Sequence, residues 1–397
     1  MTRPIPVPHA VRDTDHVKVA ISGTGFIARG ACAALSAFPQ YDVTRVLTRR
    51  PVAASAGAFP EEKLTNSIDE FLEDADIVVE CSGDAAHAAE VMIAAGEAGR
   101  NIVTINSEAQ ITVGSAMVRR GYSITEAHGD QPGCLAELHE ECLDMGFTPL
   151  AYINLKGFLN LTPSLEDMQY WGPKQGLSLR QVTSFTDGSK LQVEQAFVAN
   201  GLGAGIAQQG LIGGSVAELS DLGAHVEAAR KLGKPISDYT LNPGGPPGVL
   251  VLADCAVADA ATDYMPFTRL QTKEGGAYVL LRPHHLVHLE LTKTLRRVVE
   301  GRPPLLTNSA DPTITVAAIA KRPLPAGTVF DEALGGFDLR GEAIEIAGNA
   351  DAAPITLMDG ARLRHAVEPG QVLRMSDVEM VENRALDLYR ESLTPQG

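Results

Sequence analysis

The spacing of apolar and polar positions in the first 150 residues predicts strands that alternate with helices. Five short apolar runs have the length of buried strands: 17–21, 43–47, 77–80, 101–105 and 122–125. Three longer stretches predict helices: 27–37, 85–98 and 134–145. Because this alternation is typical of a parallel sheet covered by helices on both faces, residues 16–150 are expected to form a doubly wound α/β domain.

The pattern changes near residue 150 and again near residue 310. Residues 151–309 combine a long apolar run with helices and a glycine-rich segment at 201–214, which predicts a central α+β domain with a loop suited to close on a ligand. From residue 310 to 397 the strands are short and separated by Pro and Gly, which predicts a small all-β domain. Residues 1–15 contain three prolines and are expected to form an extended arm.

Charge and cysteine content narrow the classes of partner. The 49 acidic and 33 basic side chains give a formal charge of −16, which disfavours nucleic acid and anionic membranes as partners. The five cysteines form no CxxC pair, and no stretch has the length and apolarity of a signal peptide or membrane span. We therefore expect a cytoplasmic enzyme or binding protein with reduced thiols.

A glycine motif follows the first strand and opens the first helix. It reads Gly23-Thr-Gly25-Phe26-Ile27-Ala28, the order G-x-G-x-x-A. Glycines here let a pyrophosphate approach the backbone, and the helix N-terminus attracts its charge. Because the motif lies between a strand and a helix, it predicts dinucleotide binding rather than a merely structural turn.

The end of the second strand bears on which dinucleotide is bound. NAD-binding proteins usually carry an acidic residue there, whereas this chain has Thr48-Arg49-Arg50. Two arginines suit a 2′-phosphate, so we expect NADPH rather than NADH. The alternative is that Arg49 and Arg50 are solvated loop charges.

Polar residues also follow the next two strands. Ser82 and Gly83 come after the strand at 77–80, and Asn106 follows the strand at 101–105. Carboxyl ends of parallel strands meet at one edge of a sheet, so these residues are expected on the nicotinamide side of the cofactor site. Helix capping is the alternative role for Ser82 and Asn106.

Candidate chemistry in the central domain rests on two lysines and two acids. Lys190 and Glu194 lie four apart on one helix face, Asp187 precedes them, and Lys156 follows the long apolar run. A lysine beside a carboxylate can supply a proton and stabilise an alkoxide, although the residues alone favour a surface ion pair.

Further along the chain, Arg282 is a candidate anion clamp, and the histidines at 284, 285 and 288 are more typical of buried, hydrogen-bonded residues than of metal ligands. Asp130 could bind a substrate hydroxyl or a divalent metal, although a turn aspartate is the default interpretation.

Several segments together resemble the homoserine-dehydrogenase-like oxidoreductases that end in a SAF domain. They are the glycine motif and the segments 80–83, 106–109, 128–132, 184–190, 194–201, 282–286, 320–327 and 366–378. Within that group the chain is most similar to deoxyxylulose phosphate reductoisomerase-like proteins. The resemblance implies an NADPH-binding Rossmann domain, a central catalytic domain, a SAF-like domain and a homodimer.

The resemblance also implies roles for individual residues. It makes Lys156, Asp187, Lys190 and Glu194 candidate catalytic residues. The substrate contacts that it supports, together with the residue chemistry above, are Asp130, Asn200, Arg282 and His285.

Two departures from the family pattern narrow the chemistry. The chain has Ser107 where relatives have a lysine, and Asp130 is followed by Gln-Pro rather than by the metal-binding Asp-x-Glu. A metal-dependent isomerisation is therefore not supported, and no metal ligand is assigned.

We accordingly expect an NADPH-dependent oxidoreductase that transfers hydride to or from a small hydroxylated carbonyl compound, derived from a sugar phosphate or sugar acid. The alternatives are deoxyxylulose phosphate reductoisomerisation, homoserine-type dehydrogenation, and a non-catalytic dinucleotide sensor.

Overall fold

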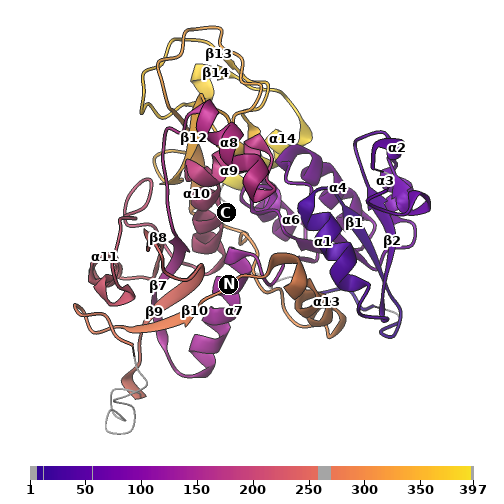
Figure 1. Ribbon diagram of the computed structural model, residues 1–397, viewed down its shortest axis with the longest axis horizontal. Helices are drawn as coiled ribbons and strands as arrows, with labels where there is room; N and C mark the ends of the chain where they lie inside the picture. The colour runs from indigo at the N-terminus through magenta and orange to yellow at the C-terminus, as the bar shows by residue number, and fades with distance from the viewer. Residues whose placement is uncertain (1–6, 12, 56, 258–269, 395–397) are drawn as a thin grey trace. The chain divides into compact units, whose positions relative to one another are not determined.

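The computed structural model describes residues 7–11, 13–55, 57–257 and 270–394 as two compact units (Figure 1). Unit 1 contains Met1–Gly133, Leu286–Asp311 and Asn383–Gly397, and unit 2 contains Cys134–His285 and Pro312–Glu382. Of the expected N-terminal arm, residues 1–6 and 12 lie outside the described residues. Unit 1 is built from three separate segments of the chain. The three-domain boundaries expected from the sequence stay a prediction.

Unit 1 is built on a six-stranded parallel sheet in the order β3-β2-β1-β4-β5-β6. The strands are β1 Val17–Ser22, β2 Tyr41–Leu47, β3 Leu64–Thr65, β4 Ile77–Glu80, β5 Asn101–Thr104 and β6 Ile124–Glu126. The helices are α1 Phe26–Leu35, α2 Val52–Ser55, α3 Ile68–Leu72, α4 Ala85–Glu97, α5 Ser107–Ala109, α6 Ser115–Arg119, α13 Leu291–Val299 and α14 Arg384–Leu393. The expected doubly wound fold is confirmed, with the strand order reversing between β1 and β4.

Apolar residues from distant segments form the core of unit 1. Ile21 of β1 and Val79 of β4 are fully buried, and Leu291 and Leu295 of α13 belong to the same cluster. These contacts explain why the chain returns to unit 1 after residue 285: α13 covers apolar surface that the strands alone would leave in water.

The C-terminal helix α14 was not predicted from the sequence. It begins after Asn383, whose side chain accepts a hydrogen bond from the Leu386 amide. At its other end the buried guanidinium of Arg119 donates to the carbonyls of Glu391 and Ser392, at 2.7 and 3.1 Å. Arg119 thereby adds donors to the last carbonyls of the helix, of which that of Glu391 also accepts from the Thr394 amide, and it ties α14 to α6 within unit 1.

Unit 2 contains a mixed four-stranded sheet in the order β10-β9-β7-β8. Its strands are β7 Thr148–Lys156, β8 Ile236–Leu241, β9 Gly248–Asp254 and β10 Tyr278–Arg282. Its helices are α8 Leu165–Gln175, α9 Leu179–Thr186, α10 Ser189–Gly201 and α11 Gly223–Leu232, while α7 Gln131–Asp144 begins in unit 1. The most enclosed of these is α10, because 11 of its 13 residues are buried.

The small C-terminal strands also belong to unit 2 and confirm the SAF-like part of the expected fold. They are β11 Ile314–Ala320, β12 Leu339–Glu345, β13 Arg362–Leu363 and β14 Val378–Glu379, which form two antiparallel pairs.

The glycine-rich segment at 201–214 is anchored in unit 2. The buried carboxylate of Asp238 accepts hydrogen bonds from the amides of Ile212 and Gly213, both at 2.9 Å. Gly205 forms a parallel bridge with Ile236 at the start of β8. The sequence suggested a loop that closes on a ligand, and these contacts instead fix the segment to the sheet.

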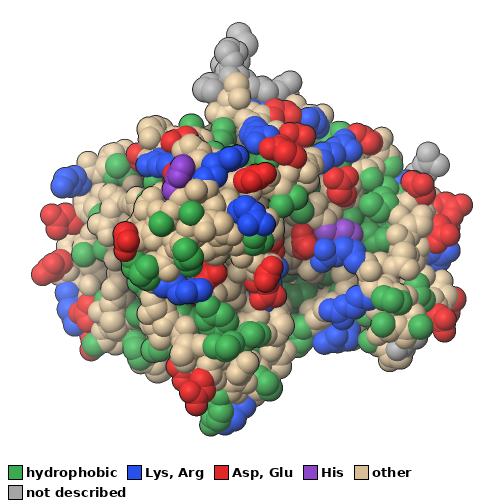
Figure 2. Space-filling model, turned by 90° about the horizontal axis from the view of Figure 1, so that it is seen from above, with side chains coloured by type: hydrophobic (Ala, Val, Ile, Leu, Met, Phe, Trp, Pro, Cys, Tyr) green, Lys and Arg blue, Asp and Glu red, His purple; other side chains and the backbone are tan. Residues whose placement is uncertain are grey.

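Two surface properties accompany this fold. Acidic and basic side chains are interspersed over the face drawn in Figure 2, without one continuous basic area. No helix among the described residues has the length and apolarity needed to cross a membrane.

Candidate functional site

The turn after β1 is shaped by two glycines with different requirements. Gly23 has φ +120°, and a Cβ there would lie 3.1 Å from the carbonyl oxygen of Cys81, so a side chain would be strained. Gly25 caps α1 without any side-chain hydrogen bond, and a Cβ there would meet nothing within 4 Å. The backbone at the start of α1 therefore borders open space at Gly25. This geometry fits the pyrophosphate of a dinucleotide.

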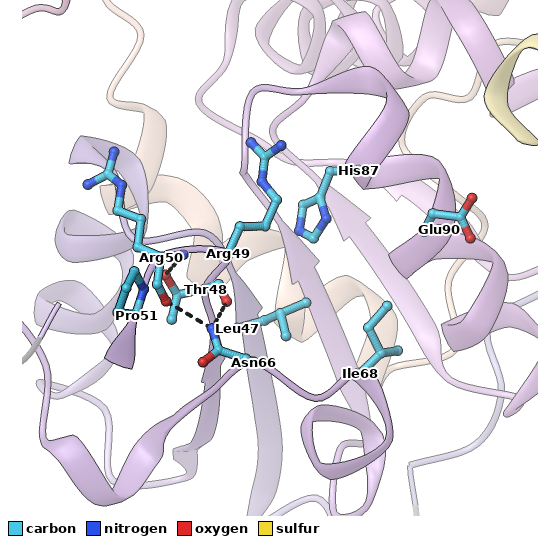
Figure 3. Close-up of a pocket in the computed structure, with 9 residues that line it drawn as sticks. All are labelled: Leu47, Thr48, Arg49, Arg50, Pro51, Asn66, Ile68, His87 and Glu90. Atoms are coloured by element: carbon cyan, nitrogen blue, oxygen red, sulfur yellow. Dashed lines mark hydrogen bonds between the residues drawn. The ribbon is translucent and has the colours of Figure 1, made fainter. Parts of the chain in front are cut away.

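Two adjoining cavities of about 270 and 590 Å³ extend from this turn within unit 1. The smaller is lined by Gly23, Gly25 and Ser82, and both are lined by residues 47–50 and His87. The larger continues past Asn66, Ile68 and Glu90 (Figure 3). The cavities therefore connect the glycine turn with the end of β2, where the adenosine ribose of a dinucleotide lies in doubly wound folds.

Asn66 holds the loop that carries the two arginines. Its side-chain amide donates to the carbonyls of Thr48 and Arg50, the second at 2.9 Å, and the Arg50 amide donates to Thr48 Oγ1 at 3.1 Å (Figure 3). The role of Asn66 was not predicted, because an asparagine before a capped helix has no distinctive spacing. These bonds fix the backbone from which both arginine side chains extend.

The two arginines differ in their surroundings. Arg49 Nη1 lies 2.6 Å from Asp84 Oδ2, with the arginine side chain 58% exposed. Burial would raise the pKa of Asp84, but the hydrogen bond from the His87 amide and the charge of Arg49 outweigh it and lower the pKa. The exposed Arg50 side chain has no hydrogen-bonding or ionic partner within the described parts of the chain. Arg50 is therefore the more available cation for a phosphate.

Glu80 brings together two of the predicted cofactor residues at the ends of β4 and β5. Its Oε1 accepts hydrogen bonds from Ser82 Oγ at 2.5 Å, the Ser82 amide at 2.7 Å and Asn106 Nδ2 at 3.2 Å. Asn106 also caps α5 through the Ala109 amide, so its capping role is real. Glu80 is fully buried and was not predicted, although an acid that ends an apolar strand was a signal. Gly83 follows with φ +72°.

In unit 2 the structure brings together part of the predicted catalytic set. Glu194 of α10 is 3% exposed and accepts hydrogen bonds from Asn154 Nδ2 at 3.0 Å and Lys156 Nζ at 3.5 Å. Lys190 lies one helical turn before Glu194, and its side chain is half-buried. Asn154 was not predicted, yet it is the residue two before Lys156 on the same face of β7.

Asp187 and Asn200 form hydrogen bonds with residues elsewhere in unit 2. The Asp187 carboxylate lies 2.5 Å from Lys321 Nζ and accepts a hydrogen bond from the Ser189 amide at 2.8 Å. Asn200 accepts from the amides of residues 313 and 314 and donates to the carbonyl of residue 314. These contacts give both residues structural roles within unit 2, and the catalytic role expected of Asp187 and the substrate contact expected of Asn200 stay predictions.

The remaining predicted substrate residues lie in different places. Arg282, at the end of β10, forms a close ion pair with Glu137 of α7, so its charge is already compensated. His285 is half-buried three residues later, and Asp130 is half-buried just before α7 begins. The substrate contacts expected of Arg282, Asp130 and His285 stay predictions. Among the described residues, no three His, Cys, Asp or Glu side chains gather as a metal site.

Three family models match consecutive parts of the chain. The homoserine dehydrogenase NAD-binding domain matches residues 23–119, the catalytic domain of oxidoreductase DRL matches residues 129–291, and the SAF domain matches residues 315–379. A comparison with curated proteins found no match.

Solved structures similar to this chain include three oxidoreductase-like proteins of low identity. A probable dehydrogenase from Thermotoga maritima is 13% identical with a TM-score of 0.42, and the match covers 74% of this chain and 91% of the other. GenD2 from gentamicin A biosynthesis, in complex with NAD, is 16% identical with a TM-score of 0.38 and coverages of 76% and 92%. UDP-N-acetylglucosamine 3-dehydrogenase GnnA from Acidithiobacillus ferrooxidans is 12% identical with a TM-score of 0.43 and coverages of 74% and 92%.

The family matches confirm the resemblance on which the sequence-based function rested. They cover the glycine turn of unit 1, the Lys156–Glu194 cluster of unit 2 and the C-terminal strands. An oxidoreductase domain beside a nicotinamide-dinucleotide domain indicates an enzyme rather than a sensor. The chain is thus an NAD(P)-dependent oxidoreductase that joins a homoserine-dehydrogenase-type NAD-binding domain, a DRL-type catalytic domain and a SAF domain.

Proposed function

We propose that the protein is an NADPH-dependent oxidoreductase that acts on a small hydroxylated carbonyl compound, in the class of sugar phosphates or sugar acids. The nicotinamide supplies or accepts the hydride. The observation that carries the proposal is the hydrogen-bonded cluster of buried Glu194 and Asn154 with the partly exposed Lys156, within the DRL-type domain. A lysine held by a buried carboxylate can protonate and stabilise an alkoxide, which carbonyl reduction requires.

The preference for NADPH rests on the loop after β2. Arg49 and Arg50 line the cavity that begins at the glycine turn, and no acidic residue stands at the end of that strand. Guanidinium groups bind phosphate oxygens through charge-assisted hydrogen bonds. We expect Gly23, Gly25 and the amides of Phe26 and Ile27 to hold the pyrophosphate, as the open space at the start of α1 allows.

Within the cluster each side chain has a separate task. Asn154 donates to Glu194 Oε2 and thereby orients the carboxylate. Glu194 accepts a hydrogen bond from the Lys156 ammonium and thereby holds it where the reacting oxygen would lie. Lys156 is 24% exposed at its side chain, so its Nζ can reach a bound substrate and donate a proton. Lys190 would return the proton or hold a hydroxyl, because it lies on the same helix face as Glu194.

The substrate class is proposed from the polar character of these residues. Lysines and buried amide and carboxylate groups suit a ligand with several hydroxyls and an anionic group. Asp130 and His285 remain proposed substrate contacts. We further propose that the enzyme is a homodimer, which the family resemblance supports. We also propose that it works in the cytoplasm, which is supported by its five cysteines, none of which forms a disulfide.

A second candidate is reductoisomerisation of deoxyxylulose phosphate. The match of the DRL catalytic domain over residues 129–291 and the similarity to reductoisomerase-like proteins favour it. It differs from simple reduction because the carbon skeleton rearranges before hydride transfer. Homoserine-type dehydrogenation is less favoured, because Ser107 occupies the position of the family's lysine and is buried.

The proposal is tested by direct binding and turnover. Purified protein is titrated with NADPH and NADH, and it is then assayed with deoxyxylulose phosphate and a panel of sugar-derived carbonyls, with and without magnesium or manganese. Mass spectrometry identifies the product. Simple reduction of a panel member supports the first candidate, and a branched polyol phosphate supports the second. A protein that binds neither dinucleotide contradicts both.

A further inference from the structure

Helix α10 of unit 2 is bonded on one side to the SAF strands. Ser189 Oγ accepts a hydrogen bond from the Gly341 amide at 2.8 Å, and Gln192 Oε1 accepts from the Ala343 amide at 2.8 Å. Both donors lie on β12, which pairs only with β11 in its sheet. Their amides are the outward groups of an open strand edge, so two side chains of α10 cover that edge.

The same helix is bonded on another side to the central sheet. Glu194 accepts from Asn154 and Lys156 of β7, and Gln195 Nε2 donates to the carbonyl of Tyr152 at 3.0 Å. Because α10 is a single rigid element, the residues that fix it against β12 also fix where Glu194 stands against β7. The SAF strands and the proposed proton-handling cluster therefore share one helix.

A buried ion pair fixes the end of α10 where Lys190 lies. Lys321 follows β11, and its Nζ lies 2.5 Å from Asp187 Oδ2 and 2.7 Å from the carbonyl oxygen of Gly336. The two charged side chains are 2% and 0% exposed. The other carboxylate oxygen of Asp187 accepts from the amide of Ser189, the first residue of α10. Lys321 thus holds the carboxylate that caps the helix.

We propose that the SAF strands position α10 for catalysis, and that Lys321, through Asp187, is the positioning residue that sets Lys190 and Glu194 against Lys156. The SAF part would then be an integral element of the catalytic unit rather than a separate ligand-binding module. Lys321 is not one of the residues that line the two cavities of unit 1. This inference rests on the proposed function only for the expected loss of turnover.

The test compares Lys321→Met, alone and combined with Asp187→Asn, with Arg322→Met in the full-length protein. Arg322 is a matched control, because it is the next residue, is 60% exposed and pairs only with Asp338 among the ion pairs of the described chain. The double variant leaves no unpaired buried charge and keeps an oxygen for the Ser189 amide, so it is expected to fold even where Lys321→Met does not.

Hydrogen–deuterium exchange gives a readout that needs no substrate. We expect amides at the start of α10 to exchange at least about 10-fold faster in the double variant, with α1 unchanged. Turnover number should fall between about 10-fold and 100-fold while the NADPH dissociation constant stays within two-fold, because small displacements of reacting groups are costly. Arg322→Met should match the wild type in both measurements.

The outcomes separate this proposal from the proposed function. If the double variant regains both wild-type exchange and wild-type turnover, the ion pair contributes only stability and the positioning role is wrong. Faster exchange with unchanged turnover also contradicts it. A wild-type enzyme without turnover on any compound of the panel contradicts the proposed substrate class instead. In that case the positioning role is still tested by exchange, because an unchanged rate of amide exchange in α10 of the double variant would overturn it.

Discussion

Replacement of Arg50 by alanine should change the cofactor preference without harming the fold. The side chain is exposed and extends from a loop that Asn66 holds through backbone carbonyls, so its removal leaves the loop bonds intact (Figure 3). A hydrogen bond to a charged group contributes about 1.5–3 kcal/mol, and solvent screening at this exposed site favours the lower end. Since 1.4 kcal/mol is ten-fold, NADPH affinity should fall about 10-fold.

The same reasoning predicts the opposite sign for Asp84→Asn. Asparagine keeps an oxygen for the His87 amide that caps α4, but it releases Arg49 from its 2.6 Å ion pair. An exposed pair of this kind is worth at most about 1 kcal/mol, so NADPH should bind up to about five-fold more tightly. NADH affinity should not change in either variant, because it lacks the 2′-phosphate.

Isothermal titration of both dinucleotides at one fixed salt concentration measures these effects. Lys18→Ala is the matched control: it removes one positive charge from an exposed pair with Asp74, near the amino end of β1 and away from the glycine turn. If Arg50→Ala weakens NADPH and NADH equally, or weakens neither, the assignment of this loop to a 2′-phosphate is wrong.

Three further predictions follow from individual side chains. Gly25→Val should keep the melting temperature near that of the wild type, because a Cβ there meets nothing within 4 Å. It should weaken the binding of both dinucleotides at least about 10-fold in titrations, because the side chain would block the pyrophosphate, and an unchanged affinity would contradict the site. Glu194→Gln should lower the turnover number about 100-fold or more with little effect on NADPH affinity, since the lysine loses its anionic partner; unchanged turnover would remove Glu194 from the mechanism. Burial raises the pKa of Cys32 from 9.0 to about 11. Alkylation of Cys32 at pH 8, followed by mass spectrometry, should therefore be about 100-fold slower than alkylation of a thiol with the unshifted pKa, and an equal rate would refute the shift.

Much of unit 1 could be predicted because its signals are local. The glycine turn needs residues 23–28 alone, and short apolar runs mark the strands whose ends carry Ser82 and Asn106. Glu80, the side chain that joins those two, was missed. An acid at the end of an apolar strand was a signal, but the sequence does not show which side chains donate hydrogen bonds to it. Local patterns therefore predicted the glycine turn and the strand ends, but not the hydrogen bonds between their side chains.

Roles in unit 2 depended on partners far along the chain. Asp187 pairs with Lys321 across 134 positions, and Asn200 binds the amide of Thr313 across 113. Arg282 meets Glu137 across 145 positions, which compensates the charge expected to clamp an anion. The sequence shows that each residue has the polar or charged side chain of a site residue. Only the tertiary structure shows which partner that side chain pairs with.

The most direct test of the central claim is NADPH consumption by the purified protein with sugar-derived carbonyl compounds, including deoxyxylulose phosphate, compared with Glu194→Gln at matched cofactor saturation. We predict turnover by the wild type on at least one of these compounds and a loss of about 100-fold or more in the variant. A wild type that binds NADPH but reduces none of them, or a variant that is equally active, would contradict the account.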